Sequence, residues 1–139
     1  MGWARLCILL SSALLLFTSC TPQPPSSPAL SSPAQAYHRI NPQQAKQWID
    51  EGGVTVVDVR RREEYEQGHI PGALLLPGEE IGSRPPAQLP DQGAVLLVYC
   101  RSGVRSKAAA QKLAALGYRS VYDLGGILDW PYETTTGEE

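Results

Sequence analysis

The sequence predicts an α/β fold in which a central, mostly parallel sheet is covered by helices on both faces. The apolar runs at residues 54–58 and 94–98 are too apolar on both faces for half-exposed strands, which is typical of central parallel strands. After the second run, Ala109, Leu113 and Leu116 recur at helical spacing. Strands that alternate with helices favour a parallel sheet with a helical layer on each face.

The remaining elements follow from turn and capping residues. A short edge strand is expected at residues 38–40, and a helix follows it because Asn41 can cap the first turn and Pro42 suits the first helical position. Gly52 and Gly53 end this helix. The other predicted elements are a helix over residues 61–67, a strand over 74–76, at most a helical turn over 79–81, a strand over 120–122, and a terminal helix containing Ile127, Leu128 and Trp130.

The amino terminus has the pattern of a secretory signal. Arg5 is its single positive charge, and two apolar runs follow at residues 6–10 and 13–17 before small polar residues and Cys20. An apolar segment of this length is too short to span a bilayer, so an uncleaved membrane anchor is the less favoured alternative. We therefore expect residues 1–19 to be a signal peptide that is cleaved before Cys20.

The sequence around Cys20 adds a membrane anchor to this expectation. Residues 17–20 resemble the lipobox of bacterial lipoproteins, although Leu is usual where Phe17 stands. The resemblance implies that Cys20 is lipidated and becomes the first mature residue. Thr21 is not the Asp that retains such proteins at the inner membrane. The expected location is outside the cytoplasm, lipid-anchored to a bacterial membrane on its periplasmic or cell-surface side, with inner and outer membrane both left open.

The mature chain divides into three parts by composition. Residues 20–36 are rich in Pro and Ser and carry no charge, which predicts an extended tether. Residues 37–133 hold the periodic segments and form one predicted domain, and residues 134–139 are a polar tail.

The cysteine count favours a single reactive thiol. Of the three cysteines, Cys7 would leave with the signal peptide and Cys20 would be consumed by lipidation, so only Cys100 would stay free. One thiol cannot form an internal disulfide, and a dithiol oxidoreductase would need a second, resolving cysteine.

Charge and ligand counts argue against nucleic acid and metal. The formal net charge is −2, and loss of Arg5 with the signal peptide makes it −3, which is too acidic for a nucleic-acid-binding surface. With two histidines and one free thiol, the chain has too few soft ligands for a zinc site.

The segment after the second apolar run is the predicted reactive site. Cys100 stands where a buried strand should turn into a helix, beyond the carboxyl end of the strand, where open α/β sheets bind ligands. Unpaired N–H groups at the helix start face the sulfur, and Gly103 allows the sharp turn. Arg101, Arg105 and Lys107 add positive charge, so we expect a thiolate nucleophile at neutral pH. The alternative is a small buried hydrophobe.

With these residues placed, the chain resembles a single-domain rhodanese, a sulfurtransferase, over residues 37–132. The matching segments occur in the same order as in that family. They are Asp58-Val59-Arg60, Glu63-Glu64-Tyr65, Gly68-His69-Ile70-Pro71-Gly72-Ala73, Cys100-Arg101-Ser102-Gly103-Val104-Arg105-Ser106, and Gly125-Gly126 with Trp130.

The resemblance implies a rhodanese-like fold and a persulfide intermediate on Cys100. It implies transfer of a sulfane sulfur from a small sulfur-containing anion such as thiosulfate to a thiol or cyanide, with no metal or organic cofactor. It further implies that the substrate-binding loop consists of Arg101, Ser102, Gly103, Val104, Arg105 and Ser106. Asp58 and Arg60 are expected to support this loop, with Asp58 accepting local hydrogen bonds, most simply from Arg60.

Two other interpretations, a phosphatase-type loop and a catalytic role for His69, are less favoured. Cysteine phosphatases and arsenate reductases of the related loop type use Cys-x5-Arg, but here the arginine comes one residue earlier, at Arg105, and Ser106 takes the phosphatase position. His69 could act as a general base, but a thiolate needs no deprotonation, so a structural turn role is favoured.

The sequence is compatible with three functions. The leading hypothesis is a membrane-tethered thiosulfate sulfurtransferase, and the second is a sulfur carrier that donates persulfide sulfur to a specific protein. The third is a non-catalytic docking module with the same fold, because fold does not dictate function. The intact loop around Cys100 argues against the third.

Overall fold

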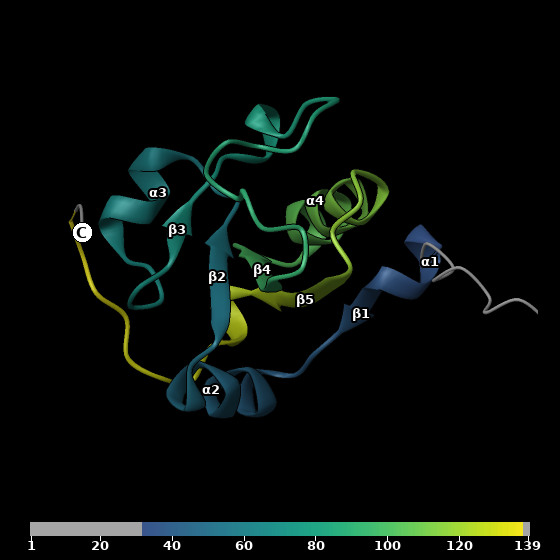
Figure 1. Cartoon of the computed structure of the whole chain (residues 1–139). Helices are drawn as coiled ribbons and strands as arrows, with labels where there is room; N and C mark the ends of the chain where they lie inside the picture. Colours follow the sequence, from purple (N-terminus) through teal and green to yellow (C-terminus); the bar gives the residue numbers. More distant parts are fainter. Residues whose placement is uncertain (1–31, 138–139) are drawn as a thin grey trace, which may run out of the picture.

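The computed structural model describes residues 32–137 and shows a five-stranded sheet in the order β1-β5-β4-β2-β3 (Figure 1). Every strand pairing in this sheet is parallel. The strands are β1 (Tyr37–Arg39), β2 (Val54–Asp58), β3 (Leu74–Leu75), β4 (Val95–Cys100) and β5 (Ser120–Gly126). The predicted α/β class with a parallel sheet is therefore confirmed.

Helices lie on both sides of the sheet, as predicted. They are α1 (Pro33–Ala36), α2 (Pro42–Glu51), α3 (Arg62–Gln67) and α4 (Val104–Ala115), with 3-10 turns η1 (Gly78–Glu80) and η2 (Ile127–Asp129). Figure 1 shows α2 on one side of the sheet and α4 on the other.

Alternation along β4 creates two separate core layers. Leu96, Val98 and Cys100 belong to the cluster that contains the buried residues of α4. Leu97 and Tyr99 belong to the cluster that contains the buried residues of α2 and α3. All five side chains are 0% exposed, because a central parallel strand is covered on both faces. The alternation places the Cys100 side chain in the layer of α4.

Local sequence explains where α2 begins and ends. The Asn41 side chain accepts a hydrogen bond of 2.8 Å from the Gln44 N–H, and Pro42 occupies the first helical position. Gly52 ends the helix with a φ of 81°, in the left-handed region that glycine favours.

The carboxyl-terminal part of the sheet differs from the prediction. Strand β5 extends to Gly126, four residues beyond the predicted end at residue 122, and a register shift between Val98 and Tyr99 brings Cys100 opposite Gly126. The predicted terminal helix containing Trp130 is wrong. Only the 3-10 turn η2 forms there, and Trp130 follows it in extended conformation as a buried residue.

The predicted domain limits also need correction. Residues 33–36, assigned to the tether, form α1, and Ala36 is buried in the core layer of α4. Residues 134–137, assigned to the polar tail, pack on the domain, because Thr135 and His69 exchange backbone hydrogen bonds of 2.8 and 2.9 Å. The predicted signal peptide, Cys20 and residues 20–31 of the tether lie outside the described residues.

The helices of residues 32–137 are all too short or too polar to cross a membrane. The elements of this segment instead place the carboxyl ends of β2 and β4 side by side. The chain leaves β2 toward α3 on one face and leaves β4 toward α4 on the other. Such a divergence is the place where open α/β sheets bind their ligands.

Candidate active site

Cys100 is the last residue of β4 and is fully buried. Its Sγ accepts a hydrogen bond of 3.1 Å from the Gly103 N–H, directly before α4 begins at Val104. The sulfur is therefore hydrogen-bonded to the N-cap residue of a twelve-residue helix, whose first N–H groups have no partner within the helix. The start of a helix is a place where anions can bind.

Two glycines allow the loop to close around the sulfur. Gly103 has a φ of 94°, and a Cβ there would lie 3.4 Å from the Gly125 Cα. A Cβ on Gly126 would lie 2.7 Å from the Ser102 Cα and would also overlap the Arg101 carbonyl oxygen. The backbone of β5 therefore supports the loop at a distance that only glycine permits.

The first turn of α4 is tied to β5 through Ser106. Its hydroxyl, which is buried, donates a hydrogen bond of 2.7 Å to the buried carboxylate of Asp123. The same carboxylate accepts hydrogen bonds from the Gly125 N–H at 3.0 Å and the Tyr37 hydroxyl at 3.1 Å. The resemblance placed Ser106 in the substrate-binding loop, and the structure shows it as an anchor of that loop.

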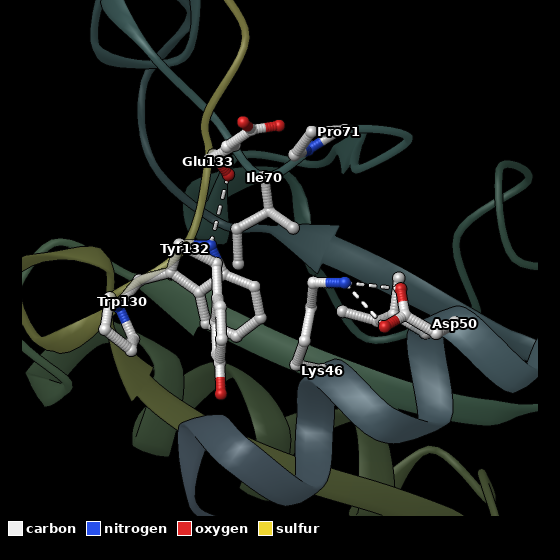
Figure 2. A pocket seen from close by; sticks show the side chains of 9 residues that line it. Lys46, Asp50, Ile70, Pro71, Trp130, Tyr132 and Glu133 are labelled. Carbon is white, nitrogen blue, oxygen red and sulfur yellow. Dashed lines mark hydrogen bonds and ion pairs between the residues drawn. The ribbon is translucent and has the colours of Figure 1, made fainter.

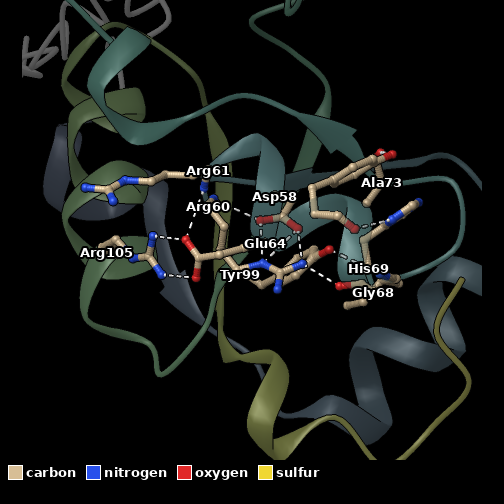
Figure 3. A network of polar contacts seen from close by, with 11 residues as sticks. Asp58, Arg60, Arg61, Glu64, Gly68, His69, Ala73, Tyr99 and Arg105 are labelled. Atoms are coloured by element: carbon tan, nitrogen blue, oxygen red, sulfur yellow. Dashed lines mark hydrogen bonds and ion pairs between the residues drawn. The ribbon is translucent and has the colours of Figure 1, made fainter. Parts of the chain in front are cut away.

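Arg105 forms an ion pair with the carboxylate of Glu64. Its two terminal nitrogens each donate a hydrogen bond of 2.7 Å to one oxygen of Glu64, which comes from α3 (Figure 3). These hydrogen bonds lower the pKa of Glu64 to about 2 and raise the pKa of Arg105. Arg101 and Lys107 are exposed. The positive charge that the sequence predicts around the sulfur is therefore partly balanced by Glu64.

A second ion pair, which is buried, lies at the end of β2. The Arg60 backbone N–H, Nε and Nη2 all donate to the carboxylate of Asp58, at 2.7 to 3.0 Å, and Nη2 also donates to the Gly68 carbonyl at 2.7 Å (Figure 3). Both side chains are nearly inaccessible. The predicted pairing of Asp58 with Arg60 is confirmed. The pair joins the end of β2 to the turn after α3.

The neighbouring Tyr99 is a fully buried residue of β4. Burial, reinforced by the negative charge of Asp58, raises the pKa of Tyr99. Its hydroxyl oxygen accepts a hydrogen bond of 3.1 Å from the Ile70 N–H. Tyr99 thus connects β4 to the segment that follows α3.

His69 has the structural position that was favoured for it. The ring is fully buried and stacks on Tyr65 with centroids 3.6 Å apart. Its Nδ1 lies 2.9 Å from the Tyr65 carbonyl, and because a carbonyl can only accept, Nδ1 carries the proton. Within the described part of the chain, Nε2 has no hydrogen-bond partner. His69 therefore fixes the turn after α3.

A hollow of about 410 Å³ opens beside the loop at the divergence of β2 and β4. Arg60, Glu64 and Arg101 line it on the polar side, and Ile127 and Leu128 line it on the apolar side. Its lining comes from the segments that follow β2, β4 and β5. The hollow offers a small anion an approach to the loop of Cys100.

A larger hollow of about 510 Å³ lies elsewhere (Figure 2). Lys46, Asp50, Trp130 and Tyr132 are among the residues that line it, and none of its lining residues belongs to the segment 100–106. Figure 2 shows the Lys46 side chain, which extends from α2 and pairs with Asp50 of the same helix. The lining of this hollow therefore does not include Cys100 or the loop that follows it.

Metal ions in proteins are bound by clusters of ligating side chains. Residues 32–137 contain no group of three or more His, Cys, Asp or Glu side chains placed to hold an ion. Cys100 is the free cysteine of the same segment.

Two residues that shape the site were not predicted from the sequence. Asp123 could have been found, because it is an isolated acid between Val121 and Leu124 in an apolar strand. Glu64 was quoted in the resemblance without a role, and its partner Arg105 lies 41 residues away. No local pattern connects residues at that separation.

Residues 41–132 match the sequence model of the rhodanese-like domain family. The thiosulfate sulfurtransferase PspE of Escherichia coli strain K12 is 37% identical over 73 residues, which is 52% of this chain and 70% of that protein. The tRNA uridine(34) hydroxylase of Yersinia pestis strain Pestoides F is 29% identical over 103 residues, which is 70% of this chain and 29% of the hydroxylase.

Solved structures give the same fold. A rhodanese with anions from E. coli superimposes with a TM-score of 0.55 at 34% identity, covering 60% of this chain and 98% of that chain. The human single-domain sulfurtransferase TSTD1 gives a TM-score of 0.59 at 28% identity, covering 66% of this chain and 93% of that chain.

Proposed function

Because the chain belongs to the rhodanese-like domain family, we propose that it is a sulfurtransferase that carries a sulfane sulfur on Cys100 as a persulfide. The observation that carries the proposal is the position of the Cys100 sulfur, which accepts the Gly103 N–H at the start of α4. The resemblance to PspE supports thiosulfate, or a similar small anion, as the sulfur donor.

The first half-reaction loads the cysteine. The Cys100 thiolate attacks the outer sulfur of thiosulfate and forms a sulfur–sulfur bond. The bond between the outer sulfur and the sulfonate sulfur breaks, and its electron pair leaves with sulfite. The Gly103 N–H on the sulfur and the guanidinium of Arg101 beside the hollow would stabilise the negative charge of thiosulfate and of the departing sulfite, and this would lower the barrier.

The second half-reaction transfers the sulfane sulfur from the Cys100 persulfide to an acceptor. The terminal sulfur of the persulfide bonds to cyanide or to an acceptor thiolate, and the electron pair of the broken bond returns to the Cys100 sulfur. The product is thiocyanate or a new persulfide. The Cys100 thiolate is regenerated, and the electron pair of each broken bond stays on a product or on Cys100, so no electrons enter or leave the cycle.

A protein acceptor is the second candidate, and one observation favours it. Val104 and Leu128 are 76% and 68% exposed, and they are the exposed large hydrophobic residues of the described segment. Val104 is the loop residue at which α4 begins, and Leu128 lines the hollow beside Arg101. Exposed apolar side chains at the rim of a reactive site suit contact with a protein surface.

We place this activity outside the cytoplasm, on a lipid anchor at Cys20. The support is the signal-like segment at residues 1–19 and the lipobox-like residues 17–20. The Pro/Ser-rich segment after Cys20 would act as the spacer between the membrane and the domain.

The proposal is tested by measuring sulfite release from thiosulfate in the presence of cyanide. The wild-type protein should release sulfite and form thiocyanate in equal amounts. Cys100→Ser should abolish both products, while Arg84→Ala, which changes an exposed arginine outside the hollow, should leave both rates unchanged. Sulfite release by folded Cys100→Ser would contradict the proposal, and circular dichroism would establish folding.

A further inference from the structure

The ion pair between Glu64 and Arg105 lies next to the reactive loop. Glu64 extends from α3 and Arg105 from the first turn of α4, and each oxygen of Glu64 faces one terminal nitrogen of Arg105 at 2.7 Å. Glu64 also lines the hollow that contains Arg101. The negative charge of Cys100 contributes to the raised pKa of Arg105, after its hydrogen bonds with Glu64. Arg105 also lies in the first turn of α4, two residues after Gly103, whose N–H donates to the Cys100 sulfur.

Two of the three arginines at this site already hold a carboxylate. Arg60 is paired with Asp58, and Arg105 is paired with Glu64. Arg101 is exposed and forms no ion pair with another residue of the segment 32–137. The site therefore offers one uncompensated guanidinium together with the loop N–H groups. A donor with two negative charges must either displace Glu64 from Arg105 or bind against the repulsion from the Glu64 carboxylate.

We infer that Glu64 is a specificity-determining residue that keeps Arg105 occupied and thereby favours sulfane donors with one negative charge over dianions such as thiosulfate. The inference rests on the proposed function and specifies its donor class. Monoanionic donors include organic persulfides and thiosulfonates. Such donors need only Arg101 and the loop N–H groups, so the Glu64–Arg105 pair can stay intact during the reaction.

A matched pair of donors isolates the effect of charge. Methanethiosulfonate differs from thiosulfate in that a methyl group replaces one charged oxygen, so it carries one negative charge. The Cys100 thiolate attacks its outer sulfur in the same way. The bond to the sulfonyl sulfur breaks, and methanesulfinate leaves with the electron pair while Cys100 becomes a persulfide.

The experiment compares kcat/KM for the two donors in the wild type, Glu64→Gln and Glu63→Gln. Glu63→Gln is the control because Glu63 is an exposed residue of the same helix and its change alters net charge equally. Glu64→Gln should raise kcat/KM for thiosulfate about fivefold, as expected for release of a partly exposed ion pair, through a lower KM. The value for methanethiosulfonate should change less than about twofold. Glu63→Gln should change neither donor.

Two further comparisons keep the inference testable if Glu64→Gln alters folding or chemistry. Thiosulfate binding to Cys100→Ser, measured by calorimetry, should tighten when Glu64→Gln is added. In an Arg105→Ala background, Glu64→Gln should lose its effect on thiosulfate, because Glu64 acts through Arg105. Equal gains for both donors, no gain for thiosulfate, or a full effect without Arg105 would each overturn the inference.

The outcome for Glu64 is separable from that for the proposed function. Sulfur transfer that depends on Cys100 but is insensitive to Glu64→Gln would refute the role of Glu64 and leave the sulfurtransferase standing. If the wild type released neither sulfite nor methanesulfinate, the sulfurtransferase would fail. The binding comparison in Cys100→Ser would then still support or overturn the selection of anions by charge.

Discussion

Single atoms set the shape of the loop around Cys100. The Sγ accepts one N–H from Gly103, and the absence of a side chain on Gly126 lets β5 approach Arg101 and Ser102. The position of Cys100 at the end of a buried strand and the sharp turn at Gly103 could be predicted, because both depend on local features of the sequence. The contact itself could not, since it depends on a register shift between β4 and β5.

Gly126→Ala should damage both stability and activity. The new Cβ would lie 2.7 Å from the Ser102 Cα, and backbone atoms cannot move aside as a flexible side chain can. We expect a loss of about 1–3 kcal/mol in the free energy of unfolding, the usual cost of overpacking, with loss of sulfur transfer. Urea denaturation measures the first and sulfite release the second. Gly82→Ala, where a Cβ meets nothing within 4 Å, is the control. A Gly126→Ala protein as stable and active as this control would contradict the account.

The Glu64–Arg105 pair should make stability depend on pH in the acid range. The pKa of Glu64 falls from its ordinary value of 4.5 to about 2 on folding, so the pair stabilises the protein above pH 4.5 and is lost as pH falls through about 2. Because both side chains are partly exposed, the contribution should be under about 1 kcal/mol.

Urea denaturation of the wild type and Glu64→Gln between pH 2 and 7 checks this dependence. The difference in the free energy of unfolding should be largest near neutral pH and should disappear near pH 2. Glu63→Gln should show no such trend. A difference between the wild type and Glu64→Gln that stays constant across the range would refute the assignment of this pair.

At the scale of elements, strands were easier to predict than their ends. Apolar runs fixed β2 and β4, and the Asn41-Pro42 pair fixed the start of α2, because these signals are local. The extension of β5 was missed because Gly125 and Gly126 usually interrupt strands, whereas here they pair with Tyr99 and Cys100. The 3-10 turn η2 replaced a predicted helix, since only Ile127–Asp129 fit between β5 and the buried Trp130.

The connection between α4 and β5 depends on the hydrogen bond from Ser106 to Asp123. Ser106→Ala removes a buried donor at 2.7 Å from the carboxylate and should cost about 1–3 kcal/mol in the free energy of unfolding. Sulfur transfer should also weaken, because the first turn of α4, into which the loop runs, loses its anchor. Ser83→Ala, at an exposed serine, is the control for both measurements. Equal stability of the two variants would show that the hydrogen bond does not hold α4 in place.

For the whole molecule, the predictions from the sequence cover residues 1–139, whereas the structure describes residues 32–137. The fold class, the order of elements and the family were all predictable, because motifs and periodicity extend along the entire domain. The packing of residues 33–36 on α4 and of Thr135 beside His69 was not, because short polar or Pro-rich segments carry no periodic signal. The lipid anchor at Cys20 stays a prediction, since Cys20 lies outside the described residues.

Cys20→Ala should release the protein from the membrane. The lipobox-like residues 17–20 make an acylated Cys20 the proposed membrane anchor, so the chain loses this anchor when the cysteine is replaced. Fractionation of cells into soluble and membrane parts measures the change, and metabolic labelling with a fatty acid should mark the wild type alone. Cys100→Ser serves as a matched control, because it also removes a cysteine but should stay in the membrane fraction. Unchanged retention of Cys20→Ala would contradict the anchor.

The most direct measurement is the intact mass of the mature protein after incubation with thiosulfate. The account predicts that each chain gains the mass of one sulfur atom at Cys100, that cyanide removes it, and that Cys100→Ser never acquires it. A wild-type protein that gains no sulfur, or a Cys100→Ser protein that gains it equally, would contradict the claim that this thiol carries the transferred atom.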